Sequence, residues 1–131
     1  MYKILAILVC FISLSRNAYA HPPSDINLAY SQSKQAFTLT INHRVSGKGH
    51  FIKQITVKLN NNDLQSKTYQ FQNNKNIVIF SFPAPGHKKD DVLSVEATCN
   101  RTGPVSKDFS IDKVLEQYNL KGQAAKEASP L

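Results

Sequence analysis

The feature that most constrains the fold is a strict alternation of apolar and polar residues within short segments. In "AFTLTIN", residues 36–42, Phe37, Leu39 and Ile41 share one face of an extended chain and polar side chains share the other. A period of two is typical of a half-buried β-strand, because successive side chains point to opposite faces of the sheet. "QITVKLN", residues 54–60, repeats the pattern. The chain is therefore expected to build sheets that each bury one face.

Similar segments recur along the chain, with turn residues between them such as "NNND" after Leu59. This count and spacing of short strands favour an all-β fold, an immunoglobulin-like antiparallel β-sandwich of about seven strands. The predicted strands are residues 25–31, 36–42, 54–60, 67–72, 76–83, 91–99 and 106–111.

The two ends of the chain differ from this central region. Residues 1–20 contain Lys3, an apolar run and the small residues Ala18 and Ala20, a pattern that predicts a secretory signal peptide cleaved near Ala20. The mature protein is then expected to be secreted or periplasmic, to begin at His21 and to lack a membrane span. Residues 21–111 form the predicted sandwich. Residues 112–131 are expected to form a short helix or a mobile tail.

The distribution of charge along the chain argues against nucleic acid as a partner, although the net charge is positive. It is +7 for the whole chain and +5 once Lys3 and Arg16 leave with the signal peptide. The basic residues are scattered and are not interleaved with aromatic residues, so a solvated surface explains them better than a nucleic-acid interface. No phosphate-cradling glycine loop, dinucleotide fingerprint or serine–histidine–carboxylate set is present.

Two of the four histidines flank one short loop. His43 ends a predicted strand, His50 begins the next, and "RVSGKG" separates them. If the two strands pair as a hairpin, both imidazoles lie at one end of the sandwich, and neutral imidazoles are good ligands for iron, copper or zinc. The alternative is that both are exposed loop histidines without a ligand.

The remaining candidates are one cysteine and two histidines. Cys99 ends the segment "DVLSVEATC", and alternation from Leu93 places its side chain inward. It is a buried free thiol, an intermolecular partner or a metal ligand, because the mature chain has no second cysteine. His21 would carry a free α-amine after cleavage, which makes it a candidate copper chelate or a frayed terminus. His87 is expected at the opposite end of the strand from Cys99, since eight residues span roughly 26 Å.

Taken together, "HPP" from His21, "HRVSGKGHFIKQITV" from His43 and "ATCN" around Cys99 resemble the iron-binding domain of the desulfoferrodoxin and superoxide reductase (neelaredoxin-like) family. The resemblance spans residues 21–111. It implies an immunoglobulin-like sandwich that holds one ferrous iron through His21, His43, His50 and the axial thiolate of Cys99. It further implies superoxide as the anionic substrate, reduced to peroxide with an electron from an unknown donor.

Three departures from the family pattern are visible. Thr102 occupies the position of the fourth histidine of the family, and a hydroxyl is a poorer ligand for a divalent metal than an imidazole. The loop between His43 and His50 is six residues, where five is commoner, and the Glu-Lys pair that precedes the first histidine is missing. Two alternatives therefore stand beside superoxide reduction: a non-catalytic copper or zinc module for binding or electron transfer, and a metal-free interaction domain.

Overall fold

The computed structural model describes residues 20–128, so the predicted signal peptide lies outside the described residues except for Ala20. No helix in this part of the chain is long and apolar enough to cross a membrane. The described residues form seven strands and one helix: β1 Asp25–Ser31, β2 Ala36–Asn42, β3 Ile52–Leu59, β4 Asn62–Thr68, β5 Ile77–Pro83, β6 Val92–Cys99, β7 Gly103–Ser110 and α1 Ile111–Glu127.

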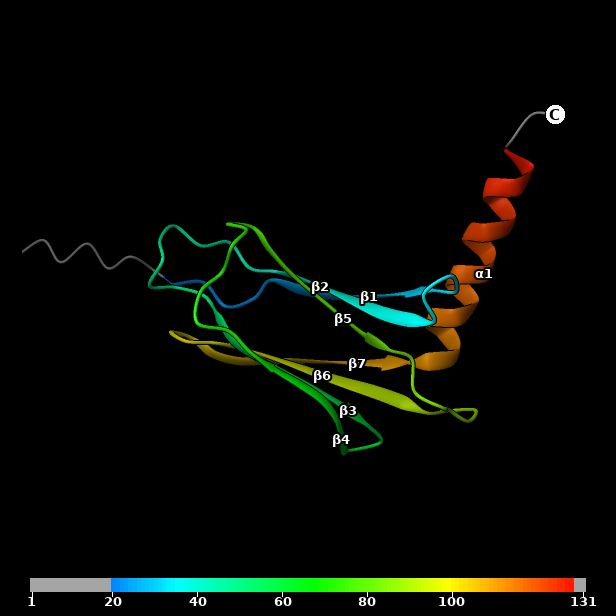
Figure 1. The fold of residues 1–131 in the computed structure, drawn as a ribbon, viewed down its shortest axis with the longest axis horizontal. Helices are drawn as coiled ribbons and strands as arrows, with labels where there is room; N and C mark the ends of the chain where they lie inside the picture. The colour runs from blue at the N-terminus through cyan, green and yellow to red at the C-terminus, as the bar shows by residue number, and fades with distance from the viewer. Residues whose placement is uncertain (1–19, 129–131) are drawn as a thin grey trace, which may run out of the picture.

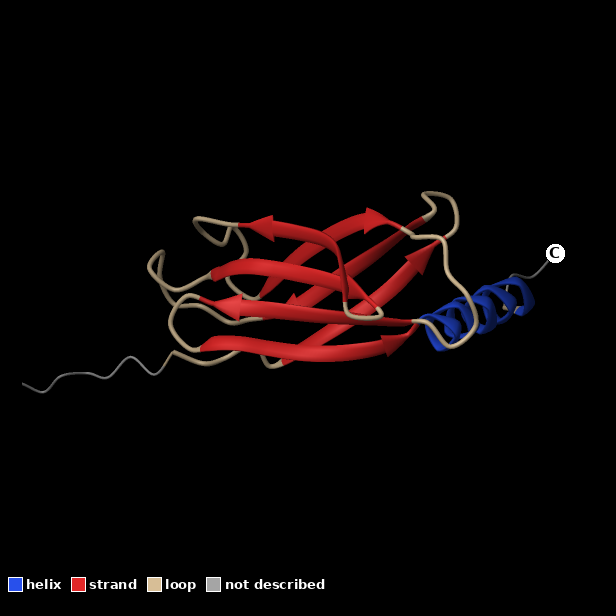
Figure 2. Ribbon diagram, turned by 90° about the horizontal axis from the view of Figure 1, so that it is seen from below, coloured by secondary structure: helices blue, strands red, loops and turns tan. Residues whose placement is uncertain are grey.

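The strands form two antiparallel sheets that lie face to face (Figures 1 and 2). One sheet has the order β1-β2-β5 and the other the order β4-β3-β6-β7. The predicted all-β sandwich of seven strands is therefore confirmed, with a C-terminal helix added at one end. Because neighbouring strands run antiparallel, the loops collect at the two ends of the sandwich, and the loop of residues 43–51 lies at the end away from α1 (Figure 1).

The core consists of the apolar residues that alternate along β2, β3 and β6. Leu39 of β2, Val57 of β3 and Val95 of β6 have no exposed surface. Burying an aliphatic side chain of this size stabilises the fold by about 1.5–3 kcal/mol. The period-two pattern read from the sequence therefore assigned the buried face of these strands correctly, because one face of each strand packs against the opposite sheet.

The fourth strand lies earlier in the chain than its predicted position. The sequence predicts a strand over residues 67–72, whereas β4 covers Asn62–Thr68 and residues 69–72 lie in the following loop. Asn60 and Asn61 both have positive φ, 49° and 69°, which is the conformation of a tight two-residue hairpin turn. β4 is a polar, exposed edge strand, so it has no apolar alternation that could mark its position.

The strands on either side of the histidine-flanked loop do not pair with each other. β2 belongs to the three-stranded sheet and β3 to the four-stranded sheet, so these strands do not form the hairpin that was considered from the sequence. The loop of residues 43–51 instead crosses from one sheet to the other at the end of the sandwich. This crossing still brings both ends of the loop to the same end of the core.

The C-terminal helix is longer than the short helix or mobile tail expected from the sequence. Ser110 caps its N-terminus by accepting a hydrogen bond from a first-turn N–H at 3.5 Å, and only Ile111 and Val114 are buried. The second half, up to Glu127, is rich in Ala, Lys, Gln and Glu. These residues favour helix even without an apolar face to bury, which explains why the helix extends beyond its packed first turns.

Candidate metal centre

His43 continues the buried face of β2 beyond the end of the strand. It follows Leu39 and Ile41 at spacings of two, and only 1% of its surface is exposed. Its backbone N–H donates to the carbonyl of Asn76, the residue before β5, at 2.8 Å, so the pairing between β2 and β5 continues for one residue beyond both strands. The extended backbone therefore points the imidazole of His43 into the end of the core.

His50 and Cys99 come from the other sheet. His50 immediately precedes β3 and is 7% exposed, while Cys99 ends β6 and is 1% exposed. Ile52 and Cys99 are partners in the register between β3 and β6, so the backbones of the two segments lie side by side. The inward orientation predicted for Cys99 from alternation along β6 is confirmed.

The three side chains meet at one point inside the end of the sandwich. His50 Nε2 lies 3.0 Å from His43 Nε2 and 3.1 Å from Cys99 Sγ. All three potential ligand atoms lie within 4.8 Å of one another, and the imidazole planes are nearly perpendicular at 87°. Two imidazole nitrogens and a thiol sulfur that converge in this way can hold a transition-metal ion.

His50 is held in the neutral form that a metal requires. Burial lowers the pKa of His50 from its ordinary value, and its electrostatic interactions with the neighbouring His43 ring and the Arg101 guanidinium lower it further. A neutral imidazole offers a lone pair to a metal, whereas a protonated one does not. The environment of His50 therefore reduces competition between protons and a metal ion.

The segment that carries His50 is fixed by the residues that follow Cys99. Asn100 accepts a hydrogen bond from the Phe51 N–H at 2.9 Å and donates to the Gly49 carbonyl at 3.0 Å, so it contacts the backbone on both sides of His50. Arg101 Nε donates to the same carbonyl at 2.9 Å, and the Arg101 N–H lies 3.4 Å from Cys99 Sγ. These contacts position the imidazole of His50 relative to the sulfur.

Gln72 is a site residue that the sequence did not indicate. It lies in the loop between β4 and β5, and its Oε1 is 2.9 Å from His43 Nδ1. The surrounding segment "QFQNNKN" is polar apart from Phe71, which is itself exposed, and it resembles any exposed loop. Neither its spacing nor its composition distinguishes Gln72 from its neighbours.

His21 lies close to this cluster without belonging to it. It is exposed, and it lines a cavity of about 500 Å³ together with His50, Arg44 and Lys75. The group of ligand atoms within 4.8 Å of one another contains His43, His50 and Cys99 but not His21. The structure therefore brings together three of the four predicted ligands and places the fourth beside His50.

The other two positions considered from the sequence lie apart from the cluster. Thr102 is exposed, in the turn between β6 and β7. His87 is exposed in the loop between β5 and β6, at the end of β6 opposite Cys99, as predicted. His87 is therefore a natural control residue for experiments on the buried histidines.

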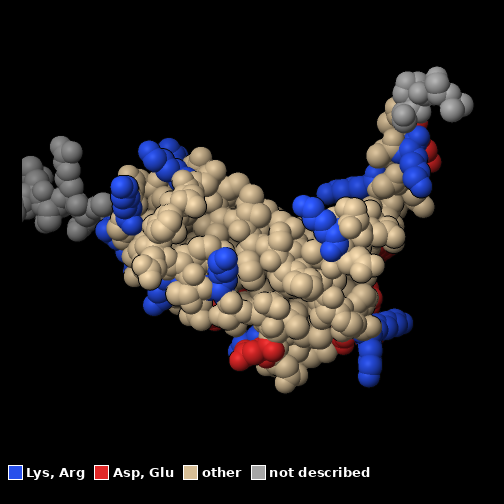
Figure 3. Space-filling model, in the orientation of Figure 1, with Lys and Arg blue, Asp and Glu red and all other residues tan. Residues whose placement is uncertain are grey.

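Positive charge collects at the cluster end of the sandwich. Its three loops, residues 43–51, 69–76 and 100–102, contain no Asp or Glu. Asp25, at the start of β1 and paired with the end of β2, is a carboxylate near this end, and its charge is paired with Lys107 at 2.9 Å. Lys and Arg side chains are visible over this end of the surface in Figure 3. The basic residues of the three loops are Arg44, Lys48, Lys75 and Arg101.

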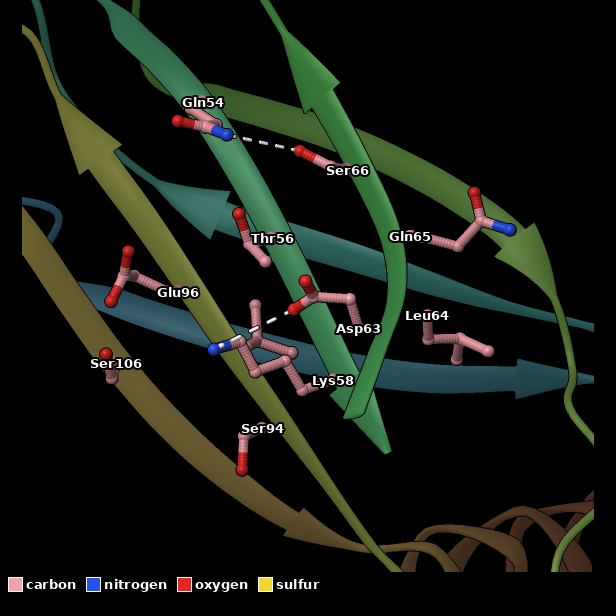
Figure 4. Close-up of a pocket in the computed structure, with 11 residues that line it drawn as sticks. Gln54, Thr56, Lys58, Asp63, Leu64, Gln65, Ser66, Ser94, Glu96 and Ser106 are labelled. Carbon is pink, nitrogen blue, oxygen red and sulfur yellow. Dashed lines mark hydrogen bonds and ion pairs between the residues drawn. The ribbon is translucent and has the colours of Figure 1, made fainter. Parts of the chain in front are cut away.

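A second, larger pocket lies on the outer face of the four-stranded sheet (Figure 4). It has a volume of about 580 Å³ and is lined mainly by polar side chains, among them the Lys58–Asp63 ion pair at 3.8 Å and Gln54, which donates to Ser66 at 3.2 Å. Among residues 20–128, none that line it is His or Cys.

The fold is similar to solved structures of the superoxide reductase (neelaredoxin) of Ignicoccus hospitalis. One single-substitution variant gives a TM-score of 0.47 and is 19% identical, over 70% of this chain and 79% of that one. Another such variant and the protein itself each give 0.45 and 19% identity, over 70% of this chain and 78% and 79% of theirs. No protein-family model matches the sequence, and no curated protein matches it in a sequence comparison.

Proposed function

We propose that this protein is an exported mononuclear metal protein that holds iron and reduces superoxide to peroxide. The observation that carries the proposal is the convergence of His43, His50 and Cys99 within 4.8 Å inside the core. Buried histidines are costly to leave without partners, and here both histidines and Cys99 direct a ligand atom toward one another. The donor set of two imidazoles and one thiolate fits iron, and also copper or zinc.

Each protein group has a defined role in this proposal. Cys99 supplies an electron-rich thiolate, with the Arg101 N–H 3.4 Å from its sulfur, a contact that adjusts how strongly the sulfur donates. His43 and His50 supply neutral imidazoles from two different sheets. Iron held by these residues would supply one electron, and with two protons from solvent this would convert superoxide to hydrogen peroxide. Burial of the three ligands limits access of other reactants to the site.

The distribution of charge supports a small anion as the substrate. Arg44 and Lys75 line the cavity that His50 also lines, and none of its lining residues within the described part of the chain carries a carboxylate. A cleft with charge of one sign raises the local concentration of the opposite ion and its association rate. In this proposal Arg44 and Lys75 attract superoxide into the cavity from which it can approach His50.

His21 is proposed as a further ligand, because it lines the same cavity as His50. We also propose that cleavage near Ala20 releases the N-terminus at His21 in the periplasm or outside the cell. N-terminal sequencing of protein recovered from a periplasmic fraction tests the cleavage site. A His21→Ala variant that binds metal as tightly as the unchanged protein would show that three ligands suffice.

The test of superoxide reduction is a single-turnover experiment. Metal-free protein is loaded with Fe(II) without oxygen and mixed with superoxide, and peroxide and oxidised iron are measured. Reduction gives one peroxide and one oxidised iron for each superoxide consumed, whereas dismutation gives half as much peroxide and no net oxidation. We expect His50→Ala to abolish the reaction and His87→Ala, at the opposite end of the sandwich, to leave it unchanged. A dismutation stoichiometry would contradict the proposal.

A copper electron-transfer module is the second candidate, and the ligand set itself favours it. Two histidines and one cysteine are the equatorial ligands of blue-copper sites, and the cluster has this composition. Metal content of the protein purified from its native compartment separates the two. Copper with an intense visible absorption that disappears in Cys99→Ser would support the second candidate, while iron would support the first.

A further inference from the structure

Gln72 holds His43 through both ends of its amide group. Its Nε2 donates to the carbonyl oxygens of His43 at 2.8 Å and Asn74 at 2.7 Å. Its Oε1 lies 2.9 Å from Nδ1 of the His43 ring. One side chain therefore contacts both the backbone and the imidazole of the same residue, and this restricts the rotation of the ring relative to its own main chain.

These contacts also determine which ring nitrogen of His43 carries the hydrogen. The amide atom that faces two carbonyl oxygens must be the NH₂ group, because an oxygen there would meet two acceptors. The amide oxygen consequently faces Nδ1 of His43. Since that oxygen can only accept, Nδ1 must donate, and in the neutral ring Nε2 then has a free lone pair.

The free lone pair of His43 points toward the other two ligands. His43 Nε2 is 3.0 Å from His50 Nε2, a distance at which the two nitrogens cannot both carry a hydrogen. A neutral imidazole in water prefers the tautomer with the hydrogen on Nε2, which would block the ligand position. Gln72 selects the less common tautomer, in which His43 is ready to bind a metal.

We infer that Gln72 is a positioning residue that fixes the tautomer and orientation of His43 for metal binding. The inference rests on the proposed metal site. Outer partners of ligating histidines fix the ring, raise its basicity and are worth about 10- to 100-fold in metal affinity. Gln72 supplies such a partner from the loop between β4 and β5.

The loop that carries Gln72 is itself held in place. Asn74 Oδ1 accepts hydrogen bonds from the backbone N–H groups of Asn76 and Ile77, at 2.8 and 3.2 Å. The Asn76 carbonyl in turn accepts from the His43 N–H at 2.8 Å. Gln72 therefore acts from a loop that is hydrogen-bonded to the same segment as the ligand it orients.

The direct test is nuclear magnetic resonance of the imidazole nitrogens in ¹⁵N-labelled, metal-free protein, at a pH well above the ordinary histidine pKa of about 6.5. We expect His43 to carry its hydrogen on Nδ1. In Gln72→Leu we expect the hydrogen to move largely to Nε2. Gln70→Leu makes the same change at an exposed position in the same loop and should have no effect.

Metal affinity provides the second measurement. Gln72→Leu is expected to bind Fe(II) or Co(II) about 10- to 100-fold more weakly than Gln70→Leu. An Nε2–H tautomer for His43 in the unchanged protein would overturn the inference without any variant, as would an unchanged tautomer in a folded Gln72→Leu protein. Absence of metal binding in the unchanged protein, with the Nδ1–H tautomer present, would instead contradict the proposed function.

Discussion

Asn100 connects the strand that carries Cys99 to the loop that carries His50, so its removal should weaken the site in a measurable way. Asn100→Ala deletes two hydrogen bonds, from the Phe51 N–H at 2.9 Å and to the Gly49 carbonyl at 3.0 Å. Each such bond contributes about 0.5–1.5 kcal/mol. Both are solvent-exposed, so water partly replaces them. We therefore expect the free energy of unfolding to fall by about 1–2 kcal/mol.

Urea unfolding of metal-free protein, followed by circular dichroism, measures this change. Asn73→Ala is the matched control, because Asn73 is an exposed loop residue at the same end of the sandwich, and it should change the free energy by less than about 0.5 kcal/mol. Metal affinity should fall in Asn100→Ala as well, since the His50 segment loses its fixed position. Equal unfolding free energies for the two variants would refute the argument that Asn100 anchors this loop.

Two further predictions concern pH and charge. The pKa of His50 is lowered in the folded protein, so as the pH falls the unfolded chain binds the extra proton first. The metal-free protein should therefore lose stability as the pH falls below about 6.5, by at most about 1.4 kcal/mol per pH unit. Urea titrations across that range should show a shallower dependence in His50→Gln, and an equally steep one would contradict this assignment. Replacing Arg44 and Lys75 by Gln should slow the reaction with superoxide about 3- to 10-fold at low ionic strength, and added salt should reduce the difference. Stopped-flow rates for the same change at Lys88 and Lys89, at the far end, should match the unchanged protein; equal slowing by both pairs would argue against a local effect.

The sequence was informative where side-chain pattern and burial coincide. Alternation along β2 and β6 predicted the buried faces, and its continuation at spacings of two placed His43 and Cys99 inside the core. The position of β4 was not predicted correctly, because an exposed edge strand needs no apolar face that could mark its residues. Pairing of the strands beside the histidine-flanked loop was considered from the sequence, and the structure places these strands in different sheets. Local pattern does not specify which sheet a strand joins.

The contacts that orient the ligands were the least predictable part of the site. Gln72 reaches His43 across 29 positions of sequence, from a loop whose residues are mostly polar and show no pattern that singles it out. Asn100 contacts the His50 segment 49 and 51 positions away. Such hydrogen bonds depend on how two loops meet in three dimensions. No periodicity or motif in a single sequence indicates which loops will contact each other.

The central claim is that His43, His50 and Cys99 hold one metal ion together. Cobalt(II) titration of the metal-free protein, followed by ultraviolet and visible absorption, tests it most directly, because a cobalt–thiolate bond gives a charge-transfer band and cobalt(II) is a good probe of mixed nitrogen and sulfur sites. We predict saturation at one equivalent with a thiolate band that is lost in Cys99→Ser and kept in His87→Ala. A protein that binds no cobalt, or one whose band is unchanged in Cys99→Ser, would contradict the account.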